Sequence, residues 1–178
     1  MLLKNVVKKN ITTFKDFPKK GILFQDVFSI TKNPKLMTLI TNSIVSYIKQ
    51  NKITKVVGID SRGFIFGSCA ALKAKLPFVP ARKAGKLPGK VYKQKYKLEY
   101  GYDQIEMQSQ SITKNDKVLV VDDLVATGGT ALATIKLLKK TNKKKIYCYF
   151  VVGLKCLDGI KKISQENIGI KILYEADK

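Results

Sequence analysis

Short runs of apolar residues alternate along the chain with longer stretches in which apolar residues recur every three or four positions. The runs show little polar alternation, which is typical of strands buried on both faces of a parallel sheet. They occupy residues 55–59, 78–80, 118–121, 146–152 and 170–174. The longer stretches predict helices at 34–49, from the mid-60s to about 75, at 131–138 and at 158–165. This order predicts an α/β fold, a mainly parallel β-sheet flanked by helices.

The N-terminal part follows a different pattern. Residues 1–17 predict a helical lead-in, and Pro18 and Gly21 then mark a loop. The short apolar piece after this loop contains Phe24, which is either plain core or an aromatic face on which a flat base stacks. From the residues alone, core packing is the favoured interpretation of Phe24.

A basic stretch rich in glycine and proline, residues 82–90, has few apolar anchors, so we expect it to be mobile. Apolar and polar residues alternate after it, which predicts a hairpin strand that turns at 101–103 and returns along 104–108. The alternating apolar residues are Tyr92, Tyr96, Leu98 and Tyr100. This segment is either a solvated surface hairpin or a lid that closes over a polyanion and excludes water.

A length of 178 residues and a hydrophobic content of 45% favour one globular domain with a substantial core. No apolar run approaches the length of a membrane span, and the first residues lack the apolar core of a signal peptide, so we expect a cytoplasmic protein. The chain has no histidine, which excludes Ser-His-Asp and Cys-His catalysis and histidine-ligated metals. The cysteines predict neither a disulfide framework nor a zinc site: Cys69, Cys148 and Cys156.

The formal net charge of the chain is +21. Such a charge attracts polyanions, either nucleic acid or a substrate with several phosphates. The alternative is a compositional bias, which we favour for most of the excess because the lysines are scattered along the chain. The two arginines, Arg62 and Arg82, are more informative, because a guanidinium offers phosphate a planar fork that lysine does not.

The stretch from Val118 to Thr130 reads V-L-V-V-D-D-L-V-A-T-G-G-T. It predicts a buried strand, then Asp122 and Asp123 at the carboxyl end of that strand, then a tight turn into a helix. Ligands of open α/β sheets bind at this edge. Glycines let the backbone approach a ligand, and the N–H groups of a helix start can cradle a phosphate. Carboxylates instead suit hydroxyls or a bridging cation, so a ribose 5-phosphate fits. An isolated D-D or G-G would more often be an ordinary solvated loop.

This stretch resembles the phosphoribosyl pyrophosphate signature of the type I phosphoribosyltransferases, and its wording is most similar to that of the adenine-specific members. Three further segments resemble that family in the expected order. They are a purine-binding loop at 17–26, a pyrophosphate loop at 58–67, and a catalytic flexible loop with R-K-x-G-K-L-P and L-E-Y-G. The resemblance implies the type I fold in a single domain over 1–178. It also implies a small hood over the base at about 1–33 and a flexible catalytic loop at about 82–108.

The resemblance further implies the roles of individual residues. The phosphoribosyl group is bound by Asp122, Asp123, Ala126, Thr127, Gly128, Gly129 and Thr130. The pyrophosphate is bound by Asp60, Ser61, Arg62 and Lys83. The adenine is bound by Leu23, Phe24 and Gln25, with the Phe24 ring stacked on the base. The catalytic residues are Glu99, Arg62 and Lys83, with Glu99 as a general base, and the lid contains Lys86 and Tyr100. Mg²⁺ is held mainly by the substrate, with Asp122 reaching it through water.

The implied reaction is adenine plus phosphoribosyl pyrophosphate giving AMP plus pyrophosphate, with Mg²⁺ as cofactor and a homodimer as the family precedent. Gln25 departs from the family, which commonly has arginine there, so the role of that side chain stays open. The alternatives are a phosphoribosyltransferase for a 6-oxo purine, and a non-catalytic sensor that binds nucleic acid. We do not expect nucleic acid as a partner, since the sequence contains no tryptophan and no aromatic–basic stripe.

Overall fold

The computed structural model describes residues 2–97, 101–141 and 145–177. The helices are α1 (Leu3–Asn10), α2 (Phe28–Thr31), α3 (Pro34–Asn51), α4 (Gly63–Ala74), α5 (Gly129–Thr141) and α6 (Gly159–Ser164). The strands are β1 (Thr12–Lys15), β2 (Leu23–Asp26), β3 (Lys55–Ile59), β4 (Phe78–Lys83), β5 (Val91–Lys97), β6 (Tyr102–Gln108), β7 (Lys117–Val125), β8 (Lys145–Leu154) and β9 (Gly169–Ala176).

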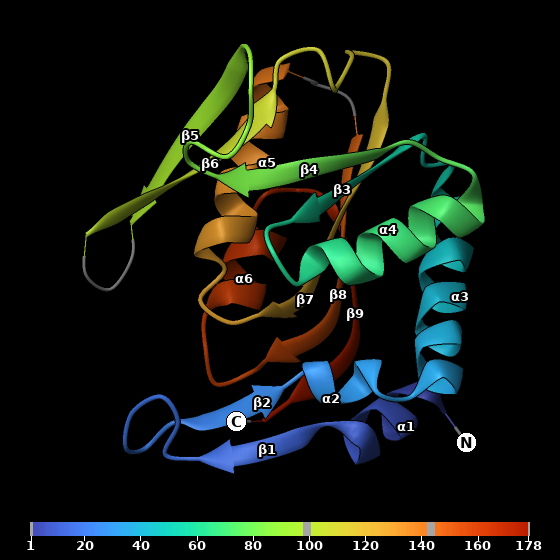
Figure 1. The fold of residues 1–178 in the computed structure, drawn as a ribbon, viewed down its shortest axis with the longest axis vertical. Helices are drawn as coiled ribbons and strands as arrows, with labels where there is room; N and C mark the ends of the chain where they lie inside the picture. Colours follow the sequence, from blue (N-terminus) through green and yellow to red (C-terminus); the bar gives the residue numbers. More distant parts are fainter. Residues whose placement is uncertain (1, 98–100, 142–144, 178) are drawn as a thin grey trace.

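A seven-stranded sheet in the order β5-β6-β4-β3-β7-β8-β9 forms the centre of the molecule (Figure 1). The strands β4, β3, β7, β8 and β9 run parallel, whereas β6 is antiparallel to both β4 and β5. The predicted fold class, a mainly parallel sheet flanked by helices, is therefore confirmed.

Both faces of the sheet are covered, which explains why its central strands read as uninterrupted apolar runs. On one face, α5 and α6 pack on Val118 and Val120 of β7. On the other face, α3 and α4 pack on Leu119 and Val121 of the same strand. All four β7 side chains are fully buried. The parallel strands are thus fixed between two helical layers, and their carboxyl ends meet at one edge.

The N-terminal segment contains a strand that the sequence did not predict. Only residues 3–10 are helical, and β1 then pairs antiparallel with β2 in a separate two-stranded sheet. The expectation of a helical lead-in through residue 17 is wrong, because Thr12 and Thr13 are β-branched and find partners on β2. The Ser29 hydroxyl links α2 to the junction between α1 and β1. It accepts the Thr12 N–H at 3.0 Å and donates to the Asn10 carbonyl at 2.8 Å.

Three strands near the predicted site are longer than expected. The strand β4 ends at Lys83 and not at residue 80, so Arg82 and Lys83 belong to a strand and not to the basic stretch that was expected to be mobile. The strand β7 continues through Asp122 and Asp123 to Val125, because β8 pairs with it along this whole length. The carboxylates therefore lie within the last residues of the strand and not after it. The return strand β6 begins at Tyr102, so the expected turn at 101–103 is wrong for two of its three residues. Leu98, at the end of the alternating pattern, lies outside the described residues.

Candidate active site

A pocket of about 280 Å³ lies at the carboxyl ends of β3 and β7, the edge at which the sequence placed the site. Its lining contains every residue predicted for the phosphoribosyl and pyrophosphate groups: Asp60, Ser61, Arg62, Lys83, Asp122, Asp123, Ala126, Thr127, Gly128, Gly129 and Thr130. Residues separated by up to seventy positions in the chain thus share one concave surface. What each contributes there follows from its local geometry.

The loop between β7 and α5 is shaped by glycine. Gly128 has φ of +79°, a left-handed conformation that side chains rarely adopt, and α5 begins at the next residue. The Gly128 carbonyl receives the Leu132 N–H at 2.8 Å, which starts the helix. The N–H groups of the first turn have no partner within the helix, so this end of the pocket attracts an anion.

Gly159, which was not among the residues predicted from the sequence, packs against this loop. The Gly159 N–H donates to the Ala126 carbonyl at 3.1 Å. A Cβ added to Gly159 would meet the Ala126 carbonyl oxygen at 2.2 Å and the Gly128 nitrogen at 2.7 Å. The loop between β7 and α5, residues 126–128, is called the phosphate loop below. It therefore packs directly against the backbone at the start of α6. Only the three-dimensional structure reveals this contact, because Gly159 lies thirty residues downstream in a segment without any motif.

The two carboxylates at the end of β7 differ in their surroundings. Arg62 Nε lies 2.9 Å from Asp123 Oδ2 in an ion pair. That oxygen is shielded from solvent and receives no well-aligned hydrogen bond from the described part of the chain. Asp122 is partly exposed to the pocket, and its Oδ1 receives the Asp123 N–H at 2.9 Å. Of the two carboxylates, Asp122 is therefore the one more open to a ligand hydroxyl.

Both carboxyl groups resist ionisation. Burial raises the pKa of Asp122 well above its usual range, and the neighbouring Asp123 charge raises it further. Burial also raises the pKa of Asp123, although the Arg62 guanidinium acts in the opposite direction. A carboxyl whose pKa is higher in the folded than in the unfolded state destabilises the fold at neutral pH. It does so less as the pH falls through the folded-state pKa.

Asp122→Asn is therefore expected to raise the thermal unfolding midpoint of the ligand-free protein at pH 7.5, because it removes a charge that the site holds at a cost. The expected rise is about 2–4 °C, the order that follows from roughly 1 kcal/mol in a domain of this size. The rise should shrink as the pH is lowered, since wild-type Asp122 then becomes neutral as well. Calorimetric scans at several pH values measure both effects. A midpoint lower than wild type at pH 7.5 would contradict this account of Asp122.

The pyrophosphate-loop residue Asp60 pairs with two basic residues, Arg82 near the end of β4 and Lys86 after that strand. Its Oδ2 lies 3.2 Å from Arg82 Nε and 3.5 Å from Lys86 Nζ. The Asp60 side chain is only 5% exposed, so the two cations neutralise an otherwise buried charge. The predicted lid residue Lys86 is thus held beside Asp60, which belongs to the pocket lining. Glu106 on β6 anchors the segment after β4 by accepting the Gly85 N–H at 3.1 Å.

The predicted base-binding residues do not line the pocket. Leu23, Phe24 and Gln25 lie on β2, and the Phe24 ring packs edge-on against Phe17 with centroids 5.0 Å apart. A contact between the hood and the pocket comes instead from Phe28 on α2, whose ring lies under the Arg62 guanidinium at 6.0 Å. Phe28 was not among the site residues predicted from the sequence.

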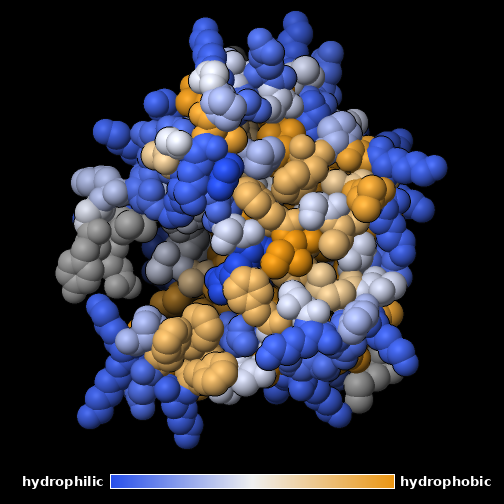
Figure 2. Space-filling model, in the orientation of Figure 1, coloured by the Kyte–Doolittle hydropathy of each residue, from blue (hydrophilic) through white to orange (hydrophobic). Residues whose placement is uncertain are grey.

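The hood leaves aromatic side chains open to solvent. Phe14, Phe17 and Phe28 are each about half exposed. Figure 2 shows hydrophobic side chains over the β1–β2 hairpin and in the middle of this face, with hydrophilic ones around the rim. Exposed aromatic rings beside a polar pocket can receive a flat apolar surface such as a nucleobase.

Two predicted residues, Glu99 and Tyr100, lie outside the described residues, so their predicted roles rest on the sequence alone. The strands that flank them, β5 and β6, form the predicted hairpin. This hairpin packs against α5: a Cβ on Gly129 would meet the Tyr96 ring at 3.4 Å. The segment that carries Glu99 is therefore attached to strands in contact with the start of the phosphate loop helix.

Metal binding can be tested against the donor set. Within residues 2–97, 101–141 and 145–177, no three Asp, Glu, Cys or His side chains converge on a common point. Mg²⁺ is commonly held by one or two carboxylates together with water and substrate phosphates, and does not need a complete protein cage. Asp122 and Asp123 fit this arrangement. The three cysteines are free thiols, as the sequence predicted.

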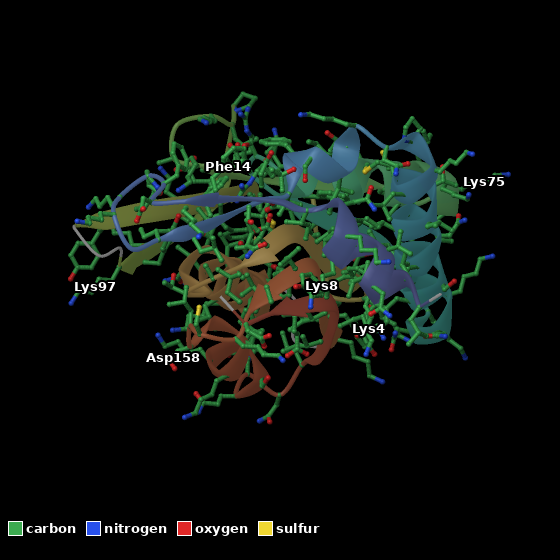
Figure 3. The ribbon with its side chains drawn as sticks, turned by 90° about the horizontal axis from the view of Figure 1, so that it is seen from below. Lys4, Lys8, Phe14, Lys75, Lys97 and Asp158 are labelled. Atoms are coloured by element: carbon green, nitrogen blue, oxygen red, sulfur yellow. The ribbon has the colours of Figure 1, made fainter. Side chains whose placement is uncertain are left out.

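The basic side chains do not gather in one stripe. In Figure 3, Lys75 and Lys97 lie on opposite sides of the molecule, and Lys4 and Lys8 lie on α1 between them. That most of the charge excess is compositional stays a prediction from the sequence. None of the described helices combines the length and the apolar character needed to cross a bilayer.

Fold and site together define a phosphoribosyl transferase: the model of the phosphoribosyl transferase domain matches residues 26–173. Sequence comparison is more specific. The chain is 44% identical over 170 residues to the adenine phosphoribosyltransferase of Shewanella piezotolerans, covering 96% of this chain and 93% of the relative. It is 45% identical over 168 residues to that of Pseudoalteromonas translucida, covering 94% and 92%. The chain therefore belongs to the adenine phosphoribosyltransferase family.

Solved structures agree. The adenine phosphoribosyltransferase of Giardia lamblia, complexed with 9-deazaadenine, matches with a TM-score of 0.92 and 36% identity, covering 100% of this chain and 99% of that one. The enzyme from Saccharomyces cerevisiae, complexed with an imino-altritol bisphosphate and adenine, matches with a TM-score of 0.89 and 36% identity, covering 96% and 98%. The type I fold expected from the sequence is thereby confirmed.

Proposed function

We propose that the protein transfers the 5-phosphoribosyl group of phosphoribosyl pyrophosphate to adenine, giving AMP and pyrophosphate in purine salvage. The observation that carries the proposal is the pocket itself, which joins a helix-start phosphate loop, a carboxylate pair and two basic residues at one sheet edge. Full-length relatives that bear the name of this activity support the choice of adenine.

The phosphate loop would hold the 5-phosphate of the ribose. The backbone N–H groups at the start of α5 and the Thr127 hydroxyl are the available donors, and the Thr130 hydroxyl would join them by turning away from the Tyr96 oxygen. Asp122 and Asp123 would accept the ribose hydroxyls, and Asp122 is the more accessible of the two. With both ends held, the anomeric carbon is fixed in position for attack, which lowers the entropic part of the barrier.

The leaving group would be stabilised at the opposite end of the pocket. Breaking the anomeric C–O bond places negative charge on the pyrophosphate and positive charge on the ribose ring. Arg62 and Lys83, both in the pocket lining, would bind the departing anion. The Asp122 and Asp123 carboxylates would favour the positive charge on the sugar. The two charges that develop are thus met by groups of opposite sign within one pocket.

Mg²⁺ is included in the proposal as a substrate-held cofactor. Asp122 would contact it through water, with the pyrophosphate oxygens supplying the remaining ligands. When bound, the ion would neutralise part of the leaving-group charge.

The base would enter from the hood side. We propose that the Phe24 ring stacks on adenine while the main-chain groups of Leu23 and Gln25 bind the edge of the base. Glu99 would accept the proton at adenine N7, and Lys86 and Tyr100 would cover the site. The hood already contacts the pocket lining through Phe28 and Arg62, so the base would bind between the hood and the pocket.

A base-selectivity assay tests the proposal. Purified protein, phosphoribosyl pyrophosphate and Mg²⁺ are mixed with adenine, hypoxanthine, guanine or xanthine, and nucleotide formation is followed. Turnover with adenine exceeding that with the other bases by at least about 10³-fold is expected, since main-chain donors and acceptors that fit a 6-amino group are left unpaired by a 6-oxo group. Turnover with a 6-oxo purine would overturn the choice of base, and donor binding without any turnover would favour a sensor.

We further propose a homodimer in the cytoplasm, in line with the family precedent. Light scattering after size exclusion would show twice the chain mass if this is right. A monomer with full activity would contradict it.

A further inference from the structure

Lys83 is held by two side chains of the hairpin. Its ammonium donates to the Asp103 carboxylate on β6 and, at 2.9 Å, to the Tyr96 hydroxyl on β5. Neither Asp103 nor Tyr96 lines the pocket, whereas Lys83 does. The two hairpin residues therefore bind the Lys83 ammonium from outside the pocket lining. An ammonium has three donors, so one N–H remains for a ligand.

The hydrogen-bond directions extend this group to the phosphate loop. The single Tyr96 proton is donated to Asp103 Oδ2 at 3.0 Å. The Tyr96 oxygen is therefore left as an acceptor, and it receives Lys83 and, at 3.2 Å, the Thr130 hydroxyl. Lys83 belongs to the leaving-group end of the pocket and Thr130 to the 5-phosphate end. One carboxylate–phenol pair thus contacts a side chain at each end: the Lys83 ammonium, which keeps a free N–H, and the Thr130 hydroxyl, which donates its single proton to Tyr96.

We propose that Asp103 is a positioning residue, which acts with Tyr96 to hold Lys83 toward the pyrophosphate and to join the two phosphate-binding ends through the β5–β6 hairpin. The inference rests on the proposed function of the pocket. Physically, a free lysine side chain loses rotamer freedom when it binds a ligand, and a lysine already fixed by a carboxylate loses less. The carboxylate also keeps the ammonium charged, since the hydrogen bonds from Lys83 to Asp103 and Tyr96 outweigh its burial and raise the pKa of Lys83.

Asp103→Asn is the first test, because it keeps the shape of the side chain and removes its charge. We expect the KM for phosphoribosyl pyrophosphate to rise about tenfold, the order of one misdirected charge-assisted hydrogen bond, while the KM for adenine stays within about twofold. Tyr96→Phe should act in the same direction. A merely structural residue would not raise one KM and spare the other, and equal changes in both would overturn the proposal.

The double variant Lys83→Met/Asp103→Asn tests whether Asp103 acts through Lys83. If it does, removing Asp103 from a chain that already lacks Lys83 changes the donor KM by less than about twofold. A full tenfold effect in that background would overturn the proposal. Asp116→Asn is the matched control. It breaks a similar pair, with Lys55 at 3.1 Å, at the amino ends of β3 and β7, on the opposite edge of the sheet. It should leave both KM values unchanged.

Titration calorimetry with pyrophosphate and Mg²⁺ separates this proposal from the proposed reaction. If the wild type binds pyrophosphate and Asp103→Asn binds it about tenfold more weakly, the role of Asp103 is supported even if no base is turned over. Equal binding by both proteins, or no binding by the wild type, would overturn it.

Discussion

Glu99→Gln is expected to lower kcat by about 10²-fold or more, the usual range for loss of a general base being about 10²–10⁴-fold. The amide keeps the size of the side chain and cannot accept the proton at adenine N7. Both KM values should stay within about threefold of wild type, because binding does not depend on that proton. Steady-state kinetics with each substrate varied in turn measures the split.

Glu166→Gln is the control variant that shows whether the loss of kcat is specific to Glu99. Glu166 lies just after α6 and pairs with Lys139 of α5, and neither residue lines the pocket. Glu166→Gln removes the carboxylate of this pair. It should leave kcat unchanged. Retention of full turnover by Glu99→Gln would remove Glu99 from the mechanism and direct attention to substrate-assisted proton transfer.

Gly159→Ala is expected to raise the KM for phosphoribosyl pyrophosphate by about 10²-fold, although Gly159 itself is absent from the pocket lining. The added methyl group would lie 2.2 Å from the Ala126 carbonyl oxygen, and the atoms it meets are backbone, which cannot rotate away. The phosphate loop must therefore shift, and a displacement of about 1 Å in a positioning group can cost about 10²-fold. Overpacking should also lower stability by about 1–3 kcal/mol.

Asp158→Ala, at the adjacent position, gives the comparison for Gly159→Ala. The Asp158 side chain is 73% exposed, and it lies 4.0 Å from the Lys162 ammonium in an exposed ion pair. We expect it to leave the donor KM within about twofold. Isothermal binding of ribose 5-phosphate to both variants would show whether the 5-phosphate end is the part affected. Wild-type affinity in Gly159→Ala would contradict the clash.

The sequence predicted those parts of the molecule in which local pattern and tertiary structure agree. The bounds of β3 and the start of α3 at Pro34 are as expected, because an apolar run and an Asn-Pro cap each specify one element. The pocket lining was also predictable, since carboxyl ends of parallel strands meet at one edge and the motifs follow those strands.

Other features depend on register and packing, which a local pattern does not contain. Tyr96 was assigned only to an alternating strand and Asp103 only to a turn, yet the β5–β6 register places them opposite each other. Gly159 supports the phosphate loop through a contact between segments with no shared motif. The charged pair Asp122–Asp123 suggested the end of a strand, whereas pairing with β8 carries the strand through it.

The position of β5 at the end of the sheet order has a consequence for the behaviour of the protein in concentrated solution. An unpaired edge strand can recruit a strand from another molecule and so start aggregation. Lys93, Lys95 and Lys97 occupy alternate, exposed positions along β5, and a second copy added there would bring like charges together. Some of the lysine excess thus protects an edge that must stay free if the hairpin is to move over the pocket.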